Sequence, residues 1–288
     1  MKKFIFLSMT MAALASCQQI DFDDIKADDG SDANVMLTFS TYGQQEFTRA
    51  AAPLTDQCAR LSVAVFDEDD AKVGSTKSQK VGDANFGTVG LSLPDGTYTI
   101  VAVAHNGDGN CTITSPTKAT FPSNKMTDTF CYCGELVVEG SVSESLEMKR
   151  VVAMMRLTIT DVIPDGVARL KFYYTGGSST LNPRTGFGCV NSKQTEYRSV
   201  IDDNGMPVSV YEIYTAPHEQ NDILKLTITS QDVSNGDIDV FEPMENIPVT
   251  VNKITTWEGS LFGGGSSSGG NIGITLDTAW DGTISYTW

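Results

Sequence analysis

The stretch "VVAMMRLTITD" (residues 151–161) alternates apolar and more polar side chains, and this alternation decides the fold class. Its apolar set recurs at every second position and consists of Val151, Ala153, Met155, Leu157 and Ile159. A period of two is the period of a β-strand, whose successive side chains point to opposite faces. We therefore expect a strand here, with this set of side chains turned towards a core.

The same period recurs on both sides of this stretch. It is found in "LSVAVF" (61–66), "TYTIVAVAH" (97–105), "RLKFYYTG" (169–176) and "DILKLTITS" (222–230). Residues 97–105 are apolar on both faces, which is typical of a central strand. Turn signals such as Pro-Asp-Gly and Asn-Gly separate the runs, and no stretch shows a sustained helical period. The chain is therefore predicted to be all-β and built from β-sandwiches.

Two sandwiches in tandem fit the chain of 288 residues better than one. Residues 140–149 are polar and poor in aromatic side chains, just before the strand that begins at Val151. We place a boundary there. The predicted domains are an N-terminal β-sandwich over 35–148 and a C-terminal β-sandwich over 149–288.

The N-terminus has the order of a secretory signal: Lys2 and Lys3, an apolar run, then small residues. The run is too short for a membrane span of about 20 residues. "LASC" (14–17) resembles the bacterial lipobox, which implies a signal peptide over 1–16 and acyl chains on Cys17. A plain signal peptide with an unrelated cysteine is the alternative.

The residues after Cys17 form a predicted acidic, flexible tether over 17–34, rich in Asp, Gly and Ser. The acids resemble the export signal of surface lipoproteins in the Bacteroidetes, and both interpretations can hold together. The formal net charge of the chain is −16, which argues against nucleic-acid binding and against a basic membrane patch. Membrane attachment would therefore depend on the lipid.

Five cysteines remain besides Cys17, so at least one is free or paired between chains. A disulfide from Cys111 to Cys131 or Cys133 is a candidate in an exported protein, and buried free thiols are the alternative. No spacing completes a zinc site, and no metal is predicted.

Catalysis finds little support. The two histidines, His105 and His218, lie in no recognised catalytic motif. The acidic run 67–70 reads as a solvated turn rather than a calcium loop. The tryptophans Trp257, Trp280 and Trp288 could stack on a sugar, but core packing is favoured. No enzyme activity and no cofactor are predicted, and a hydrolase remains the weakest alternative.

Several stretches together, in this order and behind a lipobox, resemble the fimbrillin superfamily of the Bacteroidales. They are "RLSVAVFDED" (60–69), "GTVGLSLPDGTYTIVAVAHN" (87–106), "KRVVAMMRLTITDVIPDGVARLKFYYTGGSSTLN" (149–182), "GFGCVNSKQT" (186–195) and "NKITTWEGSLF" (252–262). The chain is most similar to the FimB-like minor and anchor subunits. The resemblance implies two transthyretin-like Greek-key β-sandwiches, a lipoprotein precursor, and assembly into or anchoring of a surface pilus.

The resemblance also implies how such subunits join. In stalk and tip subunits an arginine-specific protease removes the first strand, and a strand of the next subunit fills the open groove by donor-strand exchange. Here residues 35–39 would be the first strand, and Arg49 resembles the processing site; an ordinary linker arginine is the alternative. Anchor subunits are not cut and keep their lipid.

The C-terminal end leaves two possibilities open. The Gly/Ser-rich stretch 262–271 reads as a hinge before 272–288. This last segment either folds back as a final hairpin, which is favoured, or is donated to a neighbour. We therefore expect a lipid-anchored, surface-exposed fimbrial subunit of the outer membrane that binds other subunits, with a surface lipoprotein that binds a glycan or host ligand as the alternative.

Overall fold

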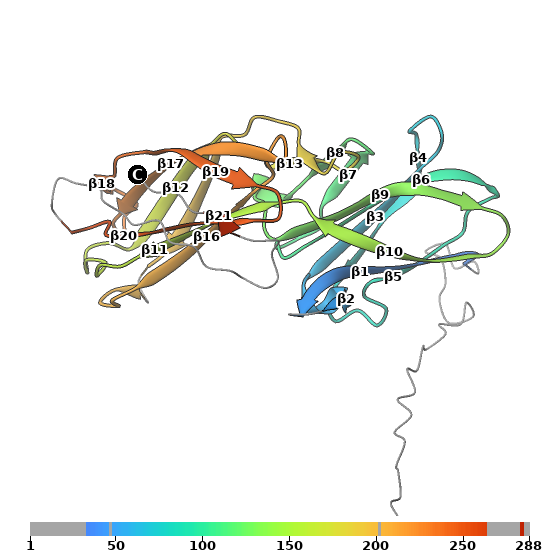
Figure 1. The fold of residues 1–288 in the computed structure, drawn as a ribbon, viewed down its shortest axis with the longest axis horizontal. Helices are drawn as coiled ribbons and strands as arrows, with labels where there is room; N and C mark the ends of the chain where they lie inside the picture. Colours follow the sequence, from blue (N-terminus) through green and yellow to red (C-terminus); the bar gives the residue numbers. More distant parts are fainter. Residues whose placement is uncertain (1–32, 46–47, 201–202, 264–282, 285–288) are drawn as a thin grey trace, which may run out of the picture.

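The chain folds into β-strands with only two short 3-10 turns among the residues that the structure describes. The computed structural model describes residues 33–45, 48–200, 203–263 and 283–284. Within these ranges no helix is long and apolar enough to cross a membrane. The prediction of an all-β fold built from sandwiches is confirmed (Figure 1).

The N-terminal half is a two-layered sandwich. Its main strands are β1 (Val35–Gln45), β2 (Thr48–Pro53), β3 (Arg60–Phe66), β4 (Lys72–Lys80), β5 (Thr88–Leu91), β6 (Gly96–His105), β9 (Thr129–Val138) and β10 (Val142–Arg150). One layer has β1 between β10 on one side and β5 with β2 on the other, and the second layer runs β9-β6-β3-β4. Among the described residues the two layers pair as strands where the end of β10 meets β9. Apolar side chains from both layers share one core.

The C-terminal half repeats this construction. Its main strands are β11 (Ala153–Ile159), β12 (Arg169–Thr175), β15 (Gln194–Ser199), β16 (Ser209–Thr215), β17 (Asn221–Gln231), β18 (Asp237–Val240), β19 (Met244–Thr250), β20 (Ile254–Gly259) and β21 (Thr283–Ile284). One layer runs β16-β11-β20-β21, and the other runs β15-β12-β17, with β18 and β19 both on the far side of β17. A second core fills the space between them.

The two halves share one strand order. The first strand of each half pairs in parallel with a late one, β1 with β10 and β11 with β20. On its other side β1 pairs antiparallel with β5 and β2, and β11 pairs antiparallel with β16. The chain therefore uses the same arrangement twice, with the first strand inside its sheet both times.

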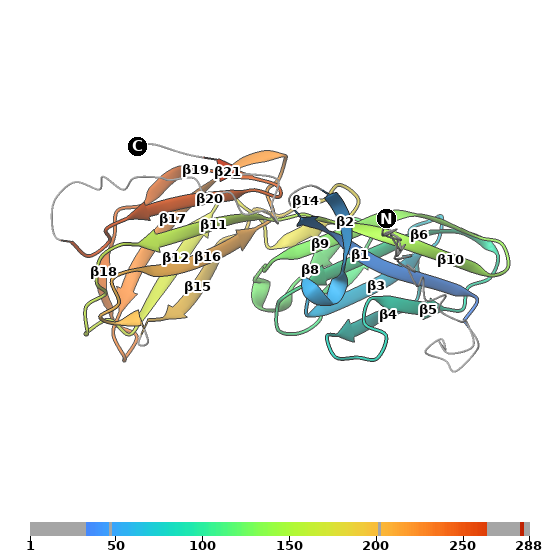
Figure 2. The ribbon, with the colours of Figure 1, turned by 60° about the horizontal axis from the view of Figure 1, so that its bottom comes forward.

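A small sheet built from insertions joins the halves (Figure 2). It runs β14-β13-β8-β7, from β7 (Thr112–Ser115), β8 (Lys118–Thr120), β13 (Thr180–Asn182) and β14 (Phe187–Gly188). Leu181 pairs with Ala119 across the junction, and a third apolar core there includes Val101, Ile113 and Met154. Burial of these side chains ties the two sandwiches into a continuous structure.

The polar stretch before Val151 is a strand rather than a connection. β10 continues through Lys149 and Arg150, which pair with Cys131 and Phe130 of β9. The chain then passes through Val151 and Val152, both buried, directly into β11. The alternation predicted in 151–161 is confirmed for Ala153, Met155, Leu157 and Ile159, which lie in the second core, whereas Val151 lies in the third.

Candidate functional site

The first strand, β1, is the element on which the predicted assembly chemistry depends. Val35, Leu37 and Phe39 alternate towards the first core and are at most 3% exposed, and Met36 on the opposite face is also buried. The parallel ladder with β10 runs from Val35–Val142 to Thr41–Met148. β5 covers the other edge over residues 35–38, and β2 covers it over residues 40–45. The predicted first strand therefore pairs inside its own sandwich on both sides.

Asn34 is part of the predicted tether, but in the structure its side chain fixes the start of β1. Its side-chain amide donates to the carbonyls of Leu93 (2.8 Å) and Gly140 (3.1 Å), and its Oδ1 accepts from the Leu93 amide (2.9 Å). Its own main chain bonds Leu91 and Val142. A short amide side chain at a strand start gives no signal in the sequence, because its partners lie 59 and 106 residues away.

Arg49 lies in β2, where its backbone pairs with Gln44 of β1. Residues 46–47, the connection between the two strands, lie outside the described residues, as do the signal segment, Cys17 and residues 17–32 of the predicted tether. The candidate processing position is therefore in a hairpin formed with the strand that its cleavage would detach.

Near the C-terminal end, β21 pairs with a strand of the C-terminal sandwich. Thr283 and Ile284 pair in parallel with Ile254 and Thr255 of β20, so the contact is not a hairpin between neighbours in sequence. The rest of 272–288, including Trp280 and Trp288, lies outside the described residues. Trp257 is 8% exposed and packs in the second core, so it is not part of a sugar-stacking surface.

Asp161 holds the segment that leads out of β20. Its carboxylate accepts hydrogen bonds from the amides of Leu261 (2.8 Å), Phe262 (2.5 Å) and Gly263 (2.6 Å), and from Ser260 Oγ (2.9 Å). Burial alone would raise the pKa of Asp161, but these hydrogen bonds to the ionised form outweigh it and lower the pKa overall. Phe262 packs edge-on against Phe241, with the two ring centres 5.3 Å apart.

The five cysteines in the described part of the chain are free thiols. Cys111 and Cys131 lie in the third core, and Cys133 packs against it. Burial raises the pKa of Cys111 to about 12 and also raises that of Cys131, so both stay protonated and unreactive at neutral pH. The three candidate disulfide residues thus gather in one region, while the pairing stays a prediction.

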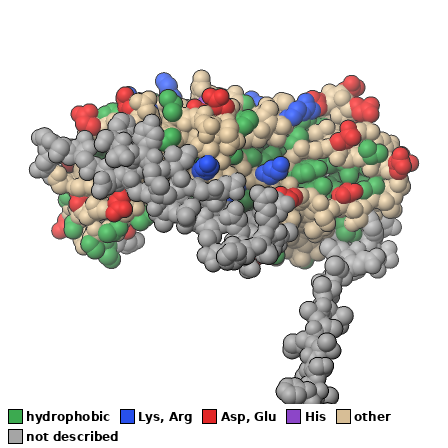
Figure 3. Space-filling view, viewed as in Figure 1, with side chains coloured by type: hydrophobic (Ala, Val, Ile, Leu, Met, Phe, Trp, Pro, Cys, Tyr) green, Lys and Arg blue, Asp and Glu red, His purple; other side chains and the backbone are tan. Residues whose placement is uncertain are grey.

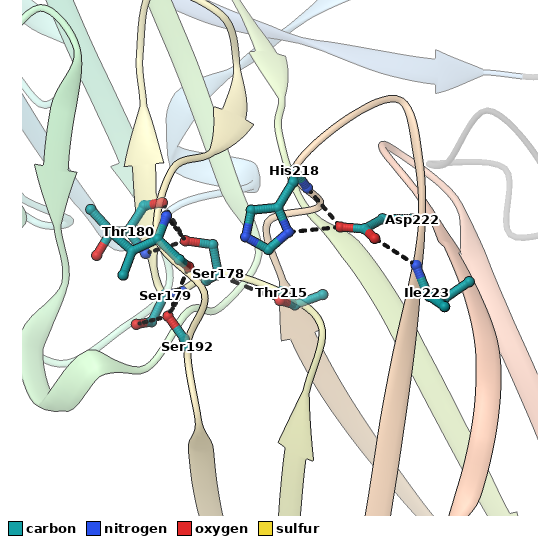
Figure 4. Close-up of polar contacts among 9 residues, drawn as sticks. Ser178, Ser179, Thr180, Ser192, Thr215, His218, Asp222 and Ile223 are labelled. Atoms are coloured by element: carbon teal, nitrogen blue, oxygen red, sulfur yellow. Dashed lines mark hydrogen bonds and ion pairs between the residues drawn. The ribbon is translucent and has the colours of Figure 1, made fainter.

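One group of side chains has the residue types of a hydrolytic triad but not its contacts (Figure 4). His218 Nδ1 lies 2.8 Å from Asp222 Oδ2, yet His218 Nε2 has no hydrogen-bond partner among the described residues. Ser178 is fully buried, and its hydroxyl donates to the Thr180 carbonyl and accepts from the amides of Thr180 and Val190. A serine engaged in this way cannot reach a substrate, so the group stabilises the fold.

The remaining candidates are structural as well. Asp67 Oδ1 accepts from the amides of Asp69 (3.0 Å) and Ala71 (2.8 Å), which closes the turn between β3 and β4. His105 is buried, and its Nδ1 accepts from the Gly107 amide at 3.0 Å. No group of three or more metal-binding side chains occurs in the described ranges. Figure 3 shows the acidic side chains spread over the visible face rather than gathered at one place.

Comparison with known proteins is informative at the level of the family. A family model described as fimbrillin-A associated anchor proteins Mfa1 and Mfa2 matches residues 27–281. None of the curated protein sequences matches the chain.

Solved structures of distant relatives are similar to the chain. A candidate polysaccharide-binding protein from Bacteroides thetaiotaomicron has 13% identity and a TM-score of 0.50, over 74% of this chain and 80% of that one. The fimbrial anchor protein Mfa2 from Porphyromonas gingivalis has 15% identity and a TM-score of 0.41, over 72% and 80%. A candidate adhesin from Bacteroides thetaiotaomicron has 14% identity and a TM-score of 0.46, over 72% and 78%.

Proposed function

The chain belongs to the family of fimbrillin-A associated anchor proteins, and on that premise we propose that it is a lipid-anchored subunit that holds a pilus to the outer membrane. As a family member it is a fimbrial, adhesin-type subunit of the cell surface, and the family is not one of enzymes. Both the predicted resemblance and the predicted lack of enzyme activity are confirmed in this way. The lipid, the membrane and the mode of assembly are the parts that we propose.

The observation that carries the proposal is the position of β1. This strand lies between β10 and the pair β5 and β2, and its side chains contribute to the first core. Full burial of a Val, Leu or Phe side chain is worth about 1.5–3 kcal/mol each. A chain that keeps β1 therefore keeps its N-terminal sandwich complete and its tether to Cys17 attached.

In this proposal Cys17 carries the acyl chains, and residues 17–32 of the predicted tether connect the membrane surface to the sandwich, since Asn34 is already bonded into it. We infer two tandem domains of the transthyretin-like type, and their common strand order supports that division. Arg49 remains intact in an anchor subunit, because cleavage would separate Cys17 and β1 from the rest of the chain. Other fimbrial subunits join by strand complementation.

N-terminal analysis of the surface protein tests the uncut state. We expect a chain that begins at Cys17 in the outer-membrane fraction, together with a fimbrial subunit that co-purifies. A chain that begins at Ala50 would instead indicate a stalk or tip subunit. An intact chain without any fimbrial partner would contradict the proposal.

Substitution of the lipidated cysteine tests the anchor. Cys17→Ser is expected to release the protein from membranes, because it removes the proposed acyl chains and a net charge of −16 does not favour binding to anionic lipids. Cys189→Ser, at an exposed cysteine of the folded part, is the matched control and should leave membrane retention unchanged. Tight retention of the Cys17→Ser protein would refute attachment through Cys17.

Glycan binding, the alternative from the sequence, receives less support. The burial of Trp257 removes one of the three aromatic residues on which that alternative depended. Binding on a glycan array that is lost when an exposed aromatic residue such as Tyr197 is substituted would support the glycan-binding alternative.

A further inference from the structure

β16 is the end strand of its sheet, and half of its backbone groups point away from that sheet. In β11 the backbone amides and carbonyls of the even-numbered residues point towards β20. The hydrogen bond from the Met154 amide to the Lys253 carbonyl shows this direction. The odd-numbered residues of β11 therefore bond β16, through Ser209, Tyr211, Ile213 and Thr215. The amides and carbonyls of Val210 and Glu212 consequently face outwards.

These outward groups are largely unoccupied. Arg198 Nη2 donates to the Glu212 carbonyl at 3.1 Å. The Val210 amide and carbonyl and the Glu212 amide have no partner within the described residues. An exposed row of this kind pairs readily with another extended chain.

Two other end strands, β4 and β18, carry more charges than β16 does. β4 carries Lys72, Lys77 and Lys80, and the short end strand β18 carries two aspartates in four residues. Charges of this type on an edge discourage strand addition. The sequence of β16, "SVYEIYT", has one charged residue, and Val210 is 53% exposed. An exposed apolar side chain beside unpaired backbone amides and carbonyls is a feature of a strand edge that binds a partner.

A groove of about 510 Å³ runs along this edge, between the two halves of the molecule. Its lining comes from the N-terminal half (Asn106, Lys125, Thr127, Asp128) and from the C-terminal half (Arg198, Val210, Tyr211, Glu212, Tyr214). A strand laid against Val210–Glu212 would thus also contact the other sandwich. At about 3.3 Å per residue, three or four residues of extended chain cover this edge.

The charges around the groove are unequal. Asp128 pairs with Arg150 and Glu212 pairs with Arg156, whereas Lys125 and Arg198 share the single carboxylate of Glu196. The Nζ of Lys125 is 3.3 Å from Glu196, and its side chain is 43% exposed. Lys125 and Arg198 therefore have one carboxylate between them, on a chain whose net charge is −16. An incoming segment with an acidic side chain complements these two positive charges.

We propose that the free edge of β16 and the adjoining groove bind an extended segment of a second fimbrial subunit, a segment that carries an acidic side chain opposite Lys125. This rests on the proposed function and adds the surface at which the partner is held. The partner strand bonds the Val210 amide and carbonyl and the Glu212 amide, and it displaces the Arg198 guanidinium from the Glu212 carbonyl. Arg198 keeps its bond to Glu196.

The test uses the full chain, purified from cells together with its fimbrial partner. A photo-reactive residue at position 208, which is exposed beside β16, is expected to crosslink to an extended segment of that partner. Val210→Pro removes the outward amide but no bond to β11, and Pro is tolerated on such edges. Crosslink yield and affinity should fall at least tenfold. Val210→Thr keeps the amide and a similar shape, and it should behave as the unmodified chain.

A second pair of variants tests the charge. Lys125→Glu should weaken partner binding several-fold, whereas Lys193→Glu, an exposed lysine outside the groove lining, should not. If Val210→Pro lowers the melting temperature markedly, Val210→Lys is used as the test variant in its place. A lysine at the edge discourages strand addition and leaves the backbone amide intact.

The outcomes separate the two proposals. Partner binding that is unchanged by Val210→Pro or Val210→Lys overturns the use of this edge and leaves the anchor function standing. A crosslink to the chain's own C-terminal segment, or to a second copy, also overturns it. Failure of any fimbrial subunit to co-purify with the unmodified chain overturns both.

Discussion

The two halves of the molecule have the same strand order but differ in how the chain enters them. β1 is the first strand that the structure describes, so a cut behind it would separate it from all the strands that follow. β11 has the same place in its sheet, but it follows β10 directly and leads into β12. In the C-terminal half, the strand that joins from the far end of the chain is β21, beside β20. The repeated fold thus meets an end of the described chain at β1 in one half and at β21 in the other.

The largest expected effect comes from matched substitutions in the two first strands. Leu37 and Leu157 are both fully buried, and Leu→Ala at either position should lower the free energy of unfolding by about 2–5 kcal/mol. Denaturant unfolding followed by fluorescence measures this. Because the third core connects the halves, we expect one transition in both variants; two separate transitions after Leu37→Ala would show that the halves unfold independently.

Acid should weaken the N-terminal half through His105. Burial, and secondarily the charge of Arg60, lowers the pKa of His105 from 6.5 to about 4. Between pH 6.5 and about 4 His105 is protonated in the unfolded chain but neutral in the folded chain. Its contribution to the free energy of unfolding is therefore fully present above pH 6.5 and decreases as the pH falls towards 4. The expected loss is about 3 kcal/mol.

His105→Asn is the comparison for this pH effect, since its side-chain oxygen can still accept from Gly107. Melting temperatures between pH 7 and 4 should vary less in that variant than in the unmodified chain. Equal slopes in both would place the acid sensitivity elsewhere.

Asn34→Ala should cost about 1–3 kcal/mol, because it leaves the Leu93 amide without its acceptor. Asn34→Asp keeps the acceptor and loses both donors, so it separates the two contributions. Hydrogen exchange at Leu93 and Val142 is the measurement. Protection that stays unchanged in Asn34→Ala would mean that β1 is held by its ladder alone.

The smallest effect is expected at the opposite end, at Asp161. Asp161→Ala removes the acceptor of the amides of Leu261, Phe262 and Gly263, at a partly solvated site, and should cost about 1 kcal/mol. Amide exchange in 261–263 should accelerate, while that of β1 should not change. In the unmodified chain the same acceleration should appear only when the pH falls through the lowered pKa of Asp161.

β11, β12 and β17 could be predicted from the sequence because one face of each is more buried than the other and the side chains alternate accordingly. β3 and β6 could be predicted because they are buried on both faces and form nearly continuous apolar runs. β10 was not predicted, because "VSESLEMKR" is polar at most positions and is half exposed. The repeated strand order and the joining sheet β14-β13-β8-β7 depend on contacts between distant residues, which one sequence does not reveal.

The candidate site could be predicted in part. The apolar run at 35–39 indicates a strand, but not that it lies between β10 and β5. Asn34 and Asp161 act through amides of distant residues, so their residue types alone gave no signal. Val210 is not identified from the sequence, because its proposed role depends on the direction of its backbone groups.

The parallel pairing of β1 with β10 has a mechanical consequence. In the proposed anchor, a pull on the pilus would reach this pair from opposite ends, through the proposed tether before β1 and through β11 at the end of β10. Force applied to opposite ends of two parallel strands acts along the ladder, so the bonds from Val35–Val142 to Thr41–Met148 share the load and do not open one after another. The subunit would therefore resist extension in shear, which is the direction in which a surface fibre is stressed.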